Sequence, residues 1–217
     1  MGYNKIILQE VLQVAETYFT SLSEVNMLEL GNQHYCIEDV SPILSTYKFN
    51  PPNHVAKYFF DFLTMKCVSI DNNGEDNTYF CNLKQISEDD ALLNSFNLVT
   101  DVGTLEHIGQ DETPENLLVN QYTALKNLHI FGTNGCIYYH SVPMVGNWYK
   151  HGACDYDATF WKEFCQLCNY TIIKEPFEIC QHPNILICVI YKKEETSVFP
   201  TFEQFSSLPG LRSTAND

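Results

Sequence analysis

The sequence has few basic residues and no long apolar segment. Lys and Arg together number 12 against 27 Asp and Glu, so the formal net charge is −15. Such a chain repels a phosphate backbone and has no basic stripe that releases counterions, which argues against DNA or RNA as a partner. No uncharged apolar run reaches about 18 residues. We therefore expect neither a nucleic-acid partner nor a membrane partner, and the oligomeric state is left open.

The N-terminal stretch lacks the apolar segment of a secretion signal, because Glu10 and Glu16 interrupt it. The nine cysteines are an odd number and lie within apolar stretches, which is typical of reduced, buried thiols rather than of a disulfide framework. Cys165 and Cys168 form one CxxC, but no second CxxC and no paired histidine follow at zinc-ligand spacing. We expect both in the core of a cytoplasmic protein.

Apolar runs alternate with helical patterns along the chain, which is long enough for one domain. The expected strands are residues 24–30, 67–71, 78–83, 96–101, 135–142, 170–179 and 184–193. The expected helices are residues 4–22, 53–66, 87–94, 114–131 and 157–169. This order predicts an α/β fold, a Rossmann-like three-layer sandwich with a mostly parallel seven-stranded sheet and a C-terminal antiparallel hairpin. We expect residues 1–195 to form the domain and residues 196–217 an extension, of which 206–217 is a loose tail.

Polar residues and glycines lie at or just after the carboxyl ends of several expected strands, where ligands bind in a doubly wound sheet. These residues are Glu29, Gly31, Asn32, Gln33, Asp71, Asn72, Asn82, Asp101, Gly103 and His140. A carboxylate in the position of Asp71 commonly accepts hydrogen bonds from a ribose diol. The first turn, ELGNQ, lacks the GxGxxG loop that approaches a pyrophosphate, which argues against NAD and FAD. A cationic cofactor with an adenosine and no phosphate fits the acids Glu29, Asp71 and Asp101 better.

Over residues 24–192 the chain resembles the class I S-adenosylmethionine-dependent methyltransferases. The motifs that carry the resemblance are MLELGNQ, VSIDNNG, TYFCNL and FNLVTDVGTLEHI. The combination of ELGNQ, IDNNG, DVGTLEHI and VPMVGNWYKHG resembles a subgroup that modifies glycans, including viral enzymes. The first motif has fewer glycines than is usual in the family, and the chain between Gly31 and Asp71 is longer than usual.

The resemblance implies a methyltransferase domain with S-adenosylmethionine as its cofactor. Glu29 and Gly31 would border the methionine part, with Asn32 and Gln33 in the same turn. Asp71 and the adjacent Asn72 would lie at the ribose, and Asn82 at the adenine edge. The sulfonium end would be lined by Asp101, Val102 and Gly103.

Three histidines are candidates for the base that accepts a proton from a hydroxyl acceptor: His107, His140 and His151. An imidazole has an unperturbed pKa near neutrality, so it suits this role. His107 is the first choice, because it follows the expected cofactor strand directly, and Glu106 beside it is assigned to substrate binding. Glu106, His107 and His151 could also form a metal site, but their spacing is not diagnostic, and no metal is predicted.

Aromatic residues are concentrated between positions 138 and 161. Trp148 and Tyr149 lie among Gly, Asn and Lys, so we expect them to contact a sugar face, whereas Phe160 and Trp161 fit a core helix. The sequence thus predicts O-methylation of a hydroxyl, most simply of a sugar in a glycan. A small metabolite or a protein side chain as the acceptor and an inactive Rossmann-like binding module are the alternatives.

Overall fold

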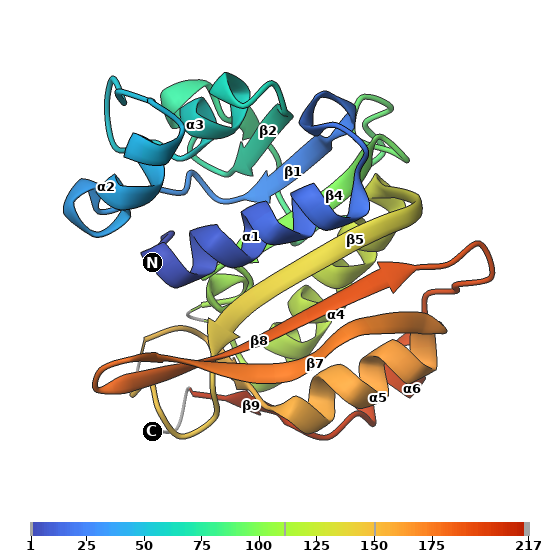
Figure 1. The fold of residues 1–217 in the computed structure, drawn as a ribbon. Helices are drawn as coiled ribbons and strands as arrows, with labels where there is room; N and C mark the ends of the chain where they lie inside the picture. Colours follow the sequence, from blue (N-terminus) through green and yellow to red (C-terminus); the bar gives the residue numbers. More distant parts are fainter. Residues whose placement is uncertain (1, 111, 150, 215–217) are drawn as a thin grey trace.

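Seven strands form one sheet in the order β3-β2-β1-β4-β5-β8-β7 (Figure 1). The computed structural model describes residues 2–110, 112–149 and 151–214. The strands of this sheet are β1 (Asn26–Leu30), β2 (Lys66–Asp71), β3 (Tyr79–Phe80), β4 (Phe96–Val102), β5 (Gly132–Pro143), β7 (Tyr170–Gln181) and β8 (Asn184–Lys193). Neighbours from β3 to β5 pair in parallel, and β8 runs antiparallel to both β5 and β7. The expected Rossmann-like sheet with its antiparallel C-terminal hairpin is confirmed.

Helices cover both faces of the sheet. α1 (Lys5–Tyr18), α2 (Ile37–Thr46) and α3 (Lys57–Phe62) pack in one apolar cluster, and in Figure 1 α1 lies in front of β4, between β1 and β5. The opposite cluster contains α4 (Pro114–Phe131), α5 (Ala158–Cys168) and α6 (Phe202–Ser206). β1 divides its side chains between the clusters, with Met27 in the first and Leu28 and Leu30 in the second. Burial on both faces explains why the strands read as continuous apolar runs.

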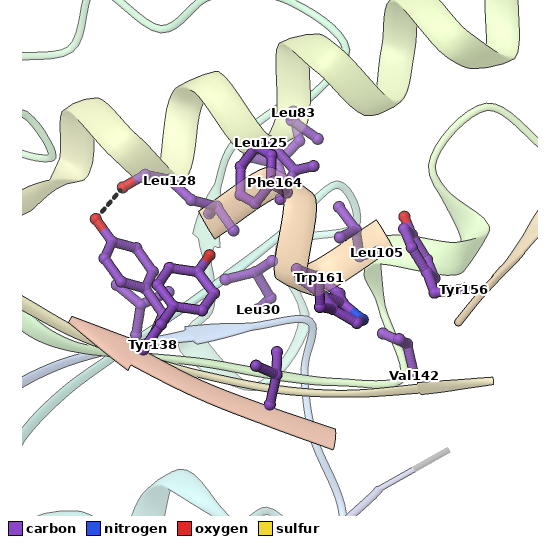
Figure 2. Close-up of a cluster of buried hydrophobic side chains, with 14 of the residues drawn as sticks. Leu30, Leu83, Leu105, Leu125, Leu128, Tyr138, Val142, Tyr156, Trp161 and Phe164 are labelled. Carbon is purple, nitrogen blue, oxygen red and sulfur yellow. Dashed lines mark hydrogen bonds between the residues drawn. The ribbon is translucent and has the colours of Figure 1, made fainter. Parts of the chain in front are cut away.

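The core of the α4 side is rich in aromatic rings (Figure 2). Trp161 is fully buried between Tyr156 and His140, with ring centroids 5.3 and 4.6 Å away. The Tyr138 hydroxyl donates a hydrogen bond to the Leu128 carbonyl at 3.1 Å. The aromatic-rich segment therefore contributes mainly to the core, as predicted for Trp161.

The cysteines are all free thiols, and seven of the nine are buried. Cys165 and Cys168 lie on the buried face of α5. Their predicted place in the core is confirmed. Within the described residues, no helix has the length and apolar character needed to cross a membrane.

Three local predictions are wrong. Residues 87–94 form turns and no helix, because the Asp89 carboxylate accepts the Ala91 N–H and holds a turn. The helix expected over 53–66 is reduced to α3, and α2 occupies a segment for which no helix is predicted. These two helices between β1 and β2 account for the long spacing between the first two motifs.

The end of the chain is more ordered than predicted. β9 (Leu211–Ser213) pairs with β6 (Cys154–Tyr156) in a second, two-stranded sheet, and Thr214 is buried. The prediction of a loose tail is therefore wrong for residues 211–214, while residues 215–217 lie outside the described residues. The division at residue 195 stays a prediction.

Candidate functional site

A pocket of about 500 Å³ opens at the carboxyl ends of β1, β2 and β4. The chain leaves β1 toward β2 on one side and β4 toward β5 on the other, so this is the topological switch point of the sheet. Its lining residues are Gly31, Asn32, Gln33, Ile70, Asp71, Asn72, Cys81, Asn82, Leu83, Lys84, Gly103, Thr104, His107, Ile108, Gly109 and Gln110. The volume is that of a site for a small molecule or cofactor.

The turn after β1 requires glycine at position 31. Gly31 has a φ of +78°, and a Cβ there would lie 2.5 Å from Thr104 Oγ1 and 2.7 Å from Gln33 Nε2. Gln33 Nε2 donates to Thr104 Oγ1 and to the Leu30 carbonyl, each at 2.8 Å, and Thr104 Oγ1 donates to the same carbonyl at 2.9 Å. These bonds join the β1 turn to the β4 turn across the floor of the pocket.

Asp71 lies at the pocket end of β2 and fixes the loops around it. Its Oδ2 accepts the Asn32 N–H at 2.8 Å, and its Oδ1 accepts the Asn72 N–H at 2.6 Å. Its Oδ1 also accepts the Asn73 N–H at 3.3 Å. A carboxylate has about four lone-pair sites, so one acceptor site of Asp71 remains for a ligand. Asn72 and Asn82 also line the pocket. Asn82 Oδ1 accepts the Lys84 N–H at 3.1 Å.

Two amide oxygens at the pocket have no hydrogen-bond partner within the described residues. They are Asn32 Oδ1 and Gln33 Oε1, and both are buried from solvent. An unpartnered buried acceptor costs free energy, so these oxygens favour a ligand that carries hydrogen-bond donors. An ammonium group or a hydroxyl meets this requirement, and a phosphate does not.

The predicted row of three carboxylates does not form a shared surface. Glu29 and Asp101 are both fully buried and lie outside the pocket lining, so Asp71 alone of the three faces the pocket. Glu29 Oε2 accepts a hydrogen bond from Ser69 at 2.6 Å. Burial raises the Glu29 pKa to about 8, against the effect of this hydrogen bond.

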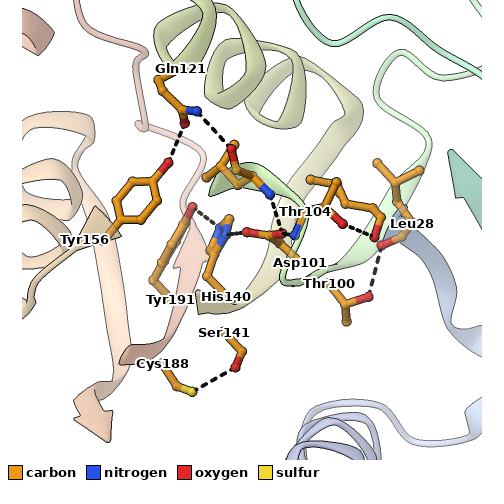
Figure 3. Close-up of polar contacts among 12 residues, drawn as sticks. Leu28, Thr100, Asp101, Thr104, Gln121, His140, Ser141, Tyr156, Cys188 and Tyr191 are labelled. Atoms are coloured by element: carbon orange, nitrogen blue, oxygen red, sulfur yellow. Dashed lines mark hydrogen bonds and ion pairs between the residues drawn. The ribbon is translucent and has the colours of Figure 1, made fainter. Parts of the chain in front are cut away.

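Asp101 organises the turn that follows β4 (Figure 3). Its Oδ1 accepts the N–H groups of Thr104 and Leu105, each at 3.1 Å, and so holds the short helix η3 (Leu105–His107). Val102, predicted to line the sulfonium end, is fully buried and lies outside the pocket lining, whereas Gly103 lines the pocket.

Glu106, His107 and His151 meet at the rim of the pocket, and His107 lines it. Glu106 Oε1 lies 3.7 Å from His107 Nε2 and 3.9 Å from His151 Nε2. Burial raises the pKa of Glu106 well above its usual value, and the charge of Asp101 adds to this. Burial lowers the pKa of both histidines. For His107, a hydrogen bond between Nδ1 and Gln110 Oε1 at 3.2 Å partly opposes this effect.

The other predicted catalytic and substrate residues do not line the pocket. His140 is fully buried between Asp101 and Tyr191, so it is shielded from any substrate in the pocket. Trp148 is half-buried, donates its indole N–H to the Ile185 carbonyl at 2.8 Å and packs against His151 with ring centroids 4.7 Å apart. Tyr149 is 75% exposed.

Sequence reasoning missed several pocket residues. Thr104 lies within the motif FNLVTDVGTLEHI, and Gln110 follows it by two residues. Neither residue type indicates on its own that the Thr104 hydroxyl bridges two turns or that the Gln110 amide contacts a histidine. Lys84 lines the pocket and forms an ion pair with Glu112 at 3.1 Å.

Comparisons with known proteins find no matching family model and no matching curated protein. The fold is similar to that of the Burkholderia thailandensis 1,6-didemethyltoxoflavin-N1-methyltransferase, with 10% identity, a TM-score of 0.50 and coverage of 86% of this chain and 83% of that one. It is also similar to the N-methyltransferase NodS from Bradyrhizobium japonicum, with 14% identity, a TM-score of 0.47 and coverage of 88% and 89%. The chain thus has the Rossmann-like fold found in methyltransferases.

Proposed function

We propose that the pocket binds S-adenosylmethionine and that the protein is an O-methyltransferase whose acceptor is a hydroxyl, with a sugar of a glycan as the acceptor class. The observation that carries the proposal is the set of acceptors around the pocket, namely Asp71 and the unpartnered oxygens of Asn32 and Gln33. Ribose hydroxyls and a methionine ammonium group supply the donors that these acceptors need. The similar Burkholderia enzyme contains S-adenosylhomocysteine, the demethylated form of this cofactor.

In this proposal different pocket residues bind different parts of the cofactor. Asp71 and Asn72 bind the ribose, Asn82 lies at the adenine edge, and Asn32 and Gln33 accept from the ammonium group. The side chains of Glu29, Asp101 and Val102 are buried, so they do not contact the cofactor. Their proposed role is to fix the ends of the strands beneath the pocket. Gly31 and Gly103 let the backbone approach the cofactor closely, and both have a positive φ.

The proposed reaction is an in-line displacement at the methyl carbon. The acceptor oxygen forms a bond to that carbon, the carbon–sulfur bond breaks, and sulfur keeps the electron pair. In the absence of a metal ion, the hydroxyl proton passes to Nε2 of His107, which is available because Nδ1 is engaged by Gln110 Oε1. Alignment of oxygen, carbon and sulfur supplies much of the rate.

The assignment of a sugar acceptor rests on the resemblance to glycan-modifying enzymes and on the aromatic side chains beside the cluster. Trp148 packs against His151, and the neighbouring Tyr149 is exposed. Flat rings of this kind cover the CH faces of sugars. An acceptor screen with oligosaccharides, small metabolites and peptides, in the presence of labelled S-adenosylmethionine, separates this acceptor from the alternatives.

Calorimetry with S-adenosylhomocysteine tests the cofactor part of the proposal. We expect saturable binding and a rise in the thermal unfolding temperature, because a ligand that binds the folded state alone stabilises it. NAD and ATP serve as controls, since the pocket has no phosphate-binding loop. Absence of heat and of a thermal shift would overturn the proposal and favour a binding module without methyltransferase activity.

A further inference from the structure

Glu106 is a fully buried carboxyl group without a hydrogen-bond partner. Its side chain has no exposed surface, and neither Oε1 nor Oε2 has a partner among the residues that the structure describes. Leaving such a group unpaired in the interior is costly, so its retention calls for a ligand or a function. The methyl transfer described above uses His107 and leaves both oxygens of Glu106 without a role.

Two imidazoles are aimed at this carboxyl group from different parts of the chain. The ligand atoms of Glu106, His107 and His151 all lie within 4.8 Å of one another. The distances from Glu106 Oε1 to the two Nε2 atoms, 3.7 and 3.9 Å, are too long for hydrogen bonds. They match the spacing of atoms that share one ion, since ligands at about 2.1 Å from a metal lie roughly 3 to 4 Å apart.

The cluster is held in place by its surroundings. Gln110 Oε1 engages Nδ1 of His107 and leaves Nε2 as the ligand atom, which is the usual orientation of a metal-bound histidine. His151 packs between Trp148 and His107, with ring centroids 4.7 and 5.0 Å away, and its Nε2 is buried and without a partner among the described residues.

The backbone fastens the loop of His151 to the turn of Glu106. The Ala153 N–H donates to the Glu106 carbonyl at 2.7 Å. A Cβ at Gly152 would lie 2.8 Å from Glu106 Cγ, so glycine allows this close approach. The loop and the turn therefore present their side chains to one point without a rearrangement.

We propose that Glu106, His107 and His151 bind a divalent transition-metal ion at the rim of the cofactor pocket. Two imidazoles and one carboxylate favour Zn²⁺, Mn²⁺, Co²⁺ or Fe²⁺ over Mg²⁺ and Ca²⁺, which prefer oxygen ligands alone. Three protein ligands leave coordination positions open, as in catalytic sites.

A role for this ion in the reaction rests on the proposed function. An acceptor hydroxyl that occupies an open position loses its proton more easily, because the cation stabilises the alkoxide. The proton then passes to solvent water, and His107 serves as a ligand in place of acting as the base.

Titration with single metal ions tests the site. After treatment with a chelator and dialysis, we expect the full-length protein to bind one Zn²⁺, Mn²⁺ or Co²⁺ per chain by calorimetry. Glu106→Gln and His151→Ala should each weaken binding by at least about tenfold, as removal of a partner in a metal site commonly does. His182→Ala, in the exposed turn between β7 and β8, should bind like the wild type. Co²⁺ adds visible d–d bands that report coordination directly.

The outcomes separate this inference from the proposed function. Wild-type protein that binds S-adenosylhomocysteine and no metal overturns the metal site alone. Metal binding that Glu106→Gln and His151→Ala leave unchanged overturns it too, because the ion then binds elsewhere. Metal binding without any binding of S-adenosylhomocysteine overturns the proposed function and supports the metal site. Far-UV circular dichroism of each variant shows whether a loss of binding reflects unfolding, and His107→Gln provides a further variant if Glu106→Gln does not fold.

Discussion

Asp101 and His140 form a buried pair across the centre of the sheet. They are register partners on β4 and β5, and Asp101 Oδ2 lies 3.0 Å from His140 Nδ1 (Figure 3). The other oxygen of Asp101 caps the turn that presents Glu106 and His107. The pair therefore links the core of the sheet to the rim of the pocket.

Removing the carboxylate should destabilise the whole protein. In Asp101→Ala the imidazole of His140 and the backbone N–H groups of Thr104 and Leu105 lose their hydrogen-bond partner, and those of His140 and Leu105 are buried. We expect the free energy of unfolding to fall by about 3–5 kcal/mol, because each buried polar group left without a partner costs roughly 1–3 kcal/mol. Urea denaturation measures this loss. A decrease below about 1 kcal/mol would contradict the structural role of the pair.

The strands of the fold could be predicted because both faces of the sheet are buried, which leaves apolar runs that end at turn residues. Helices were harder to predict. α2 contains Pro42, a residue that usually ends a helix, but here the hydroxyl of Ser41 donates to the Glu38 carbonyl, which the missing N–H leaves available. The Ser87 N–H is bound by Asn127 Oδ1, a contact with α4 that no local pattern reveals.

The sequence could predict which residues lie at the strand ends, but not which face of the sheet each side chain points to. Glu29 pairs with Thr100 and Leu30 with Asp101, so the two acids are one residue out of register. Because side chains alternate between faces, this single step turns Glu29 toward the α1 side and Asp101 toward the α4 side. The contact of His151 with Glu106 depends on the fold of a loop far along the chain, so it could not be predicted from the sequence.

Alanine at Gly31 should disrupt the pocket, and Gly135 provides a matched control. Both glycines have a similar positive φ, 78° and 81°, but a Cβ at Gly135 meets no atom within 4 Å. Gly135→Ala should therefore cost only about 1–2 kcal/mol of backbone strain. Gly31→Ala adds overlap with Thr104 and Gln33, so we expect roughly 2–4 kcal/mol and loss of S-adenosylhomocysteine binding. Equal losses for the two variants, with binding intact, would show that the turn is not tightly packed.

The buried Glu29 should make the stability depend on pH. Its pKa in the folded protein is about 8, raised by burial from 4.5, and its titratable neighbours are Tyr3, Cys67 and Lys57. The folded state keeps a proton that the unfolded state releases, so the contribution of Glu29 is complete below the unfolded pKa and is lost as the pH rises toward 8. Between about pH 5.5 and 7.5 this amounts to roughly 2–3 kcal/mol.

Glu29→Gln provides the measurement of this effect, because the amide keeps the shape of the side chain and cannot ionise. Urea denaturation at several pH values should show that the variant gains stability relative to the wild type as the pH rises, while the two differ least in acid. Parallel stability profiles for the two proteins would mean that Glu29 does not hold its proton in the folded state.

The carboxylate of Asp71 should be essential for cofactor affinity. Asp71→Asn replaces one acceptor oxygen with a donor and removes the charge that faces the pocket. Hydrogen bonds to charged groups contribute about 1.5–3 kcal/mol, so we expect the Kd for S-adenosylhomocysteine to rise by roughly 10- to 100-fold. The control is Asp90→Asn, because Asp90 is exposed and lies outside the pocket lining. An unchanged Kd in Asp71→Asn would remove Asp71 from the binding site.

Turnover of variants at His107 and His151 distinguishes a histidine base from a metal site. If Nε2 of His107 accepts the proton alone, His107→Ala slows methyl transfer by about a hundredfold or more and His151→Ala stays near the wild-type rate. If the cluster binds an ion, each substitution removes a ligand, and both variants lose turnover to a similar extent. We expect the second pattern, measured in single turnovers at saturating S-adenosylmethionine with His182→Ala as the control. A wild-type rate in His151→Ala would argue against the metal ion and leave His107 as the base. A wild-type rate in His107→Ala would exclude His107 both as the base and as a metal ligand.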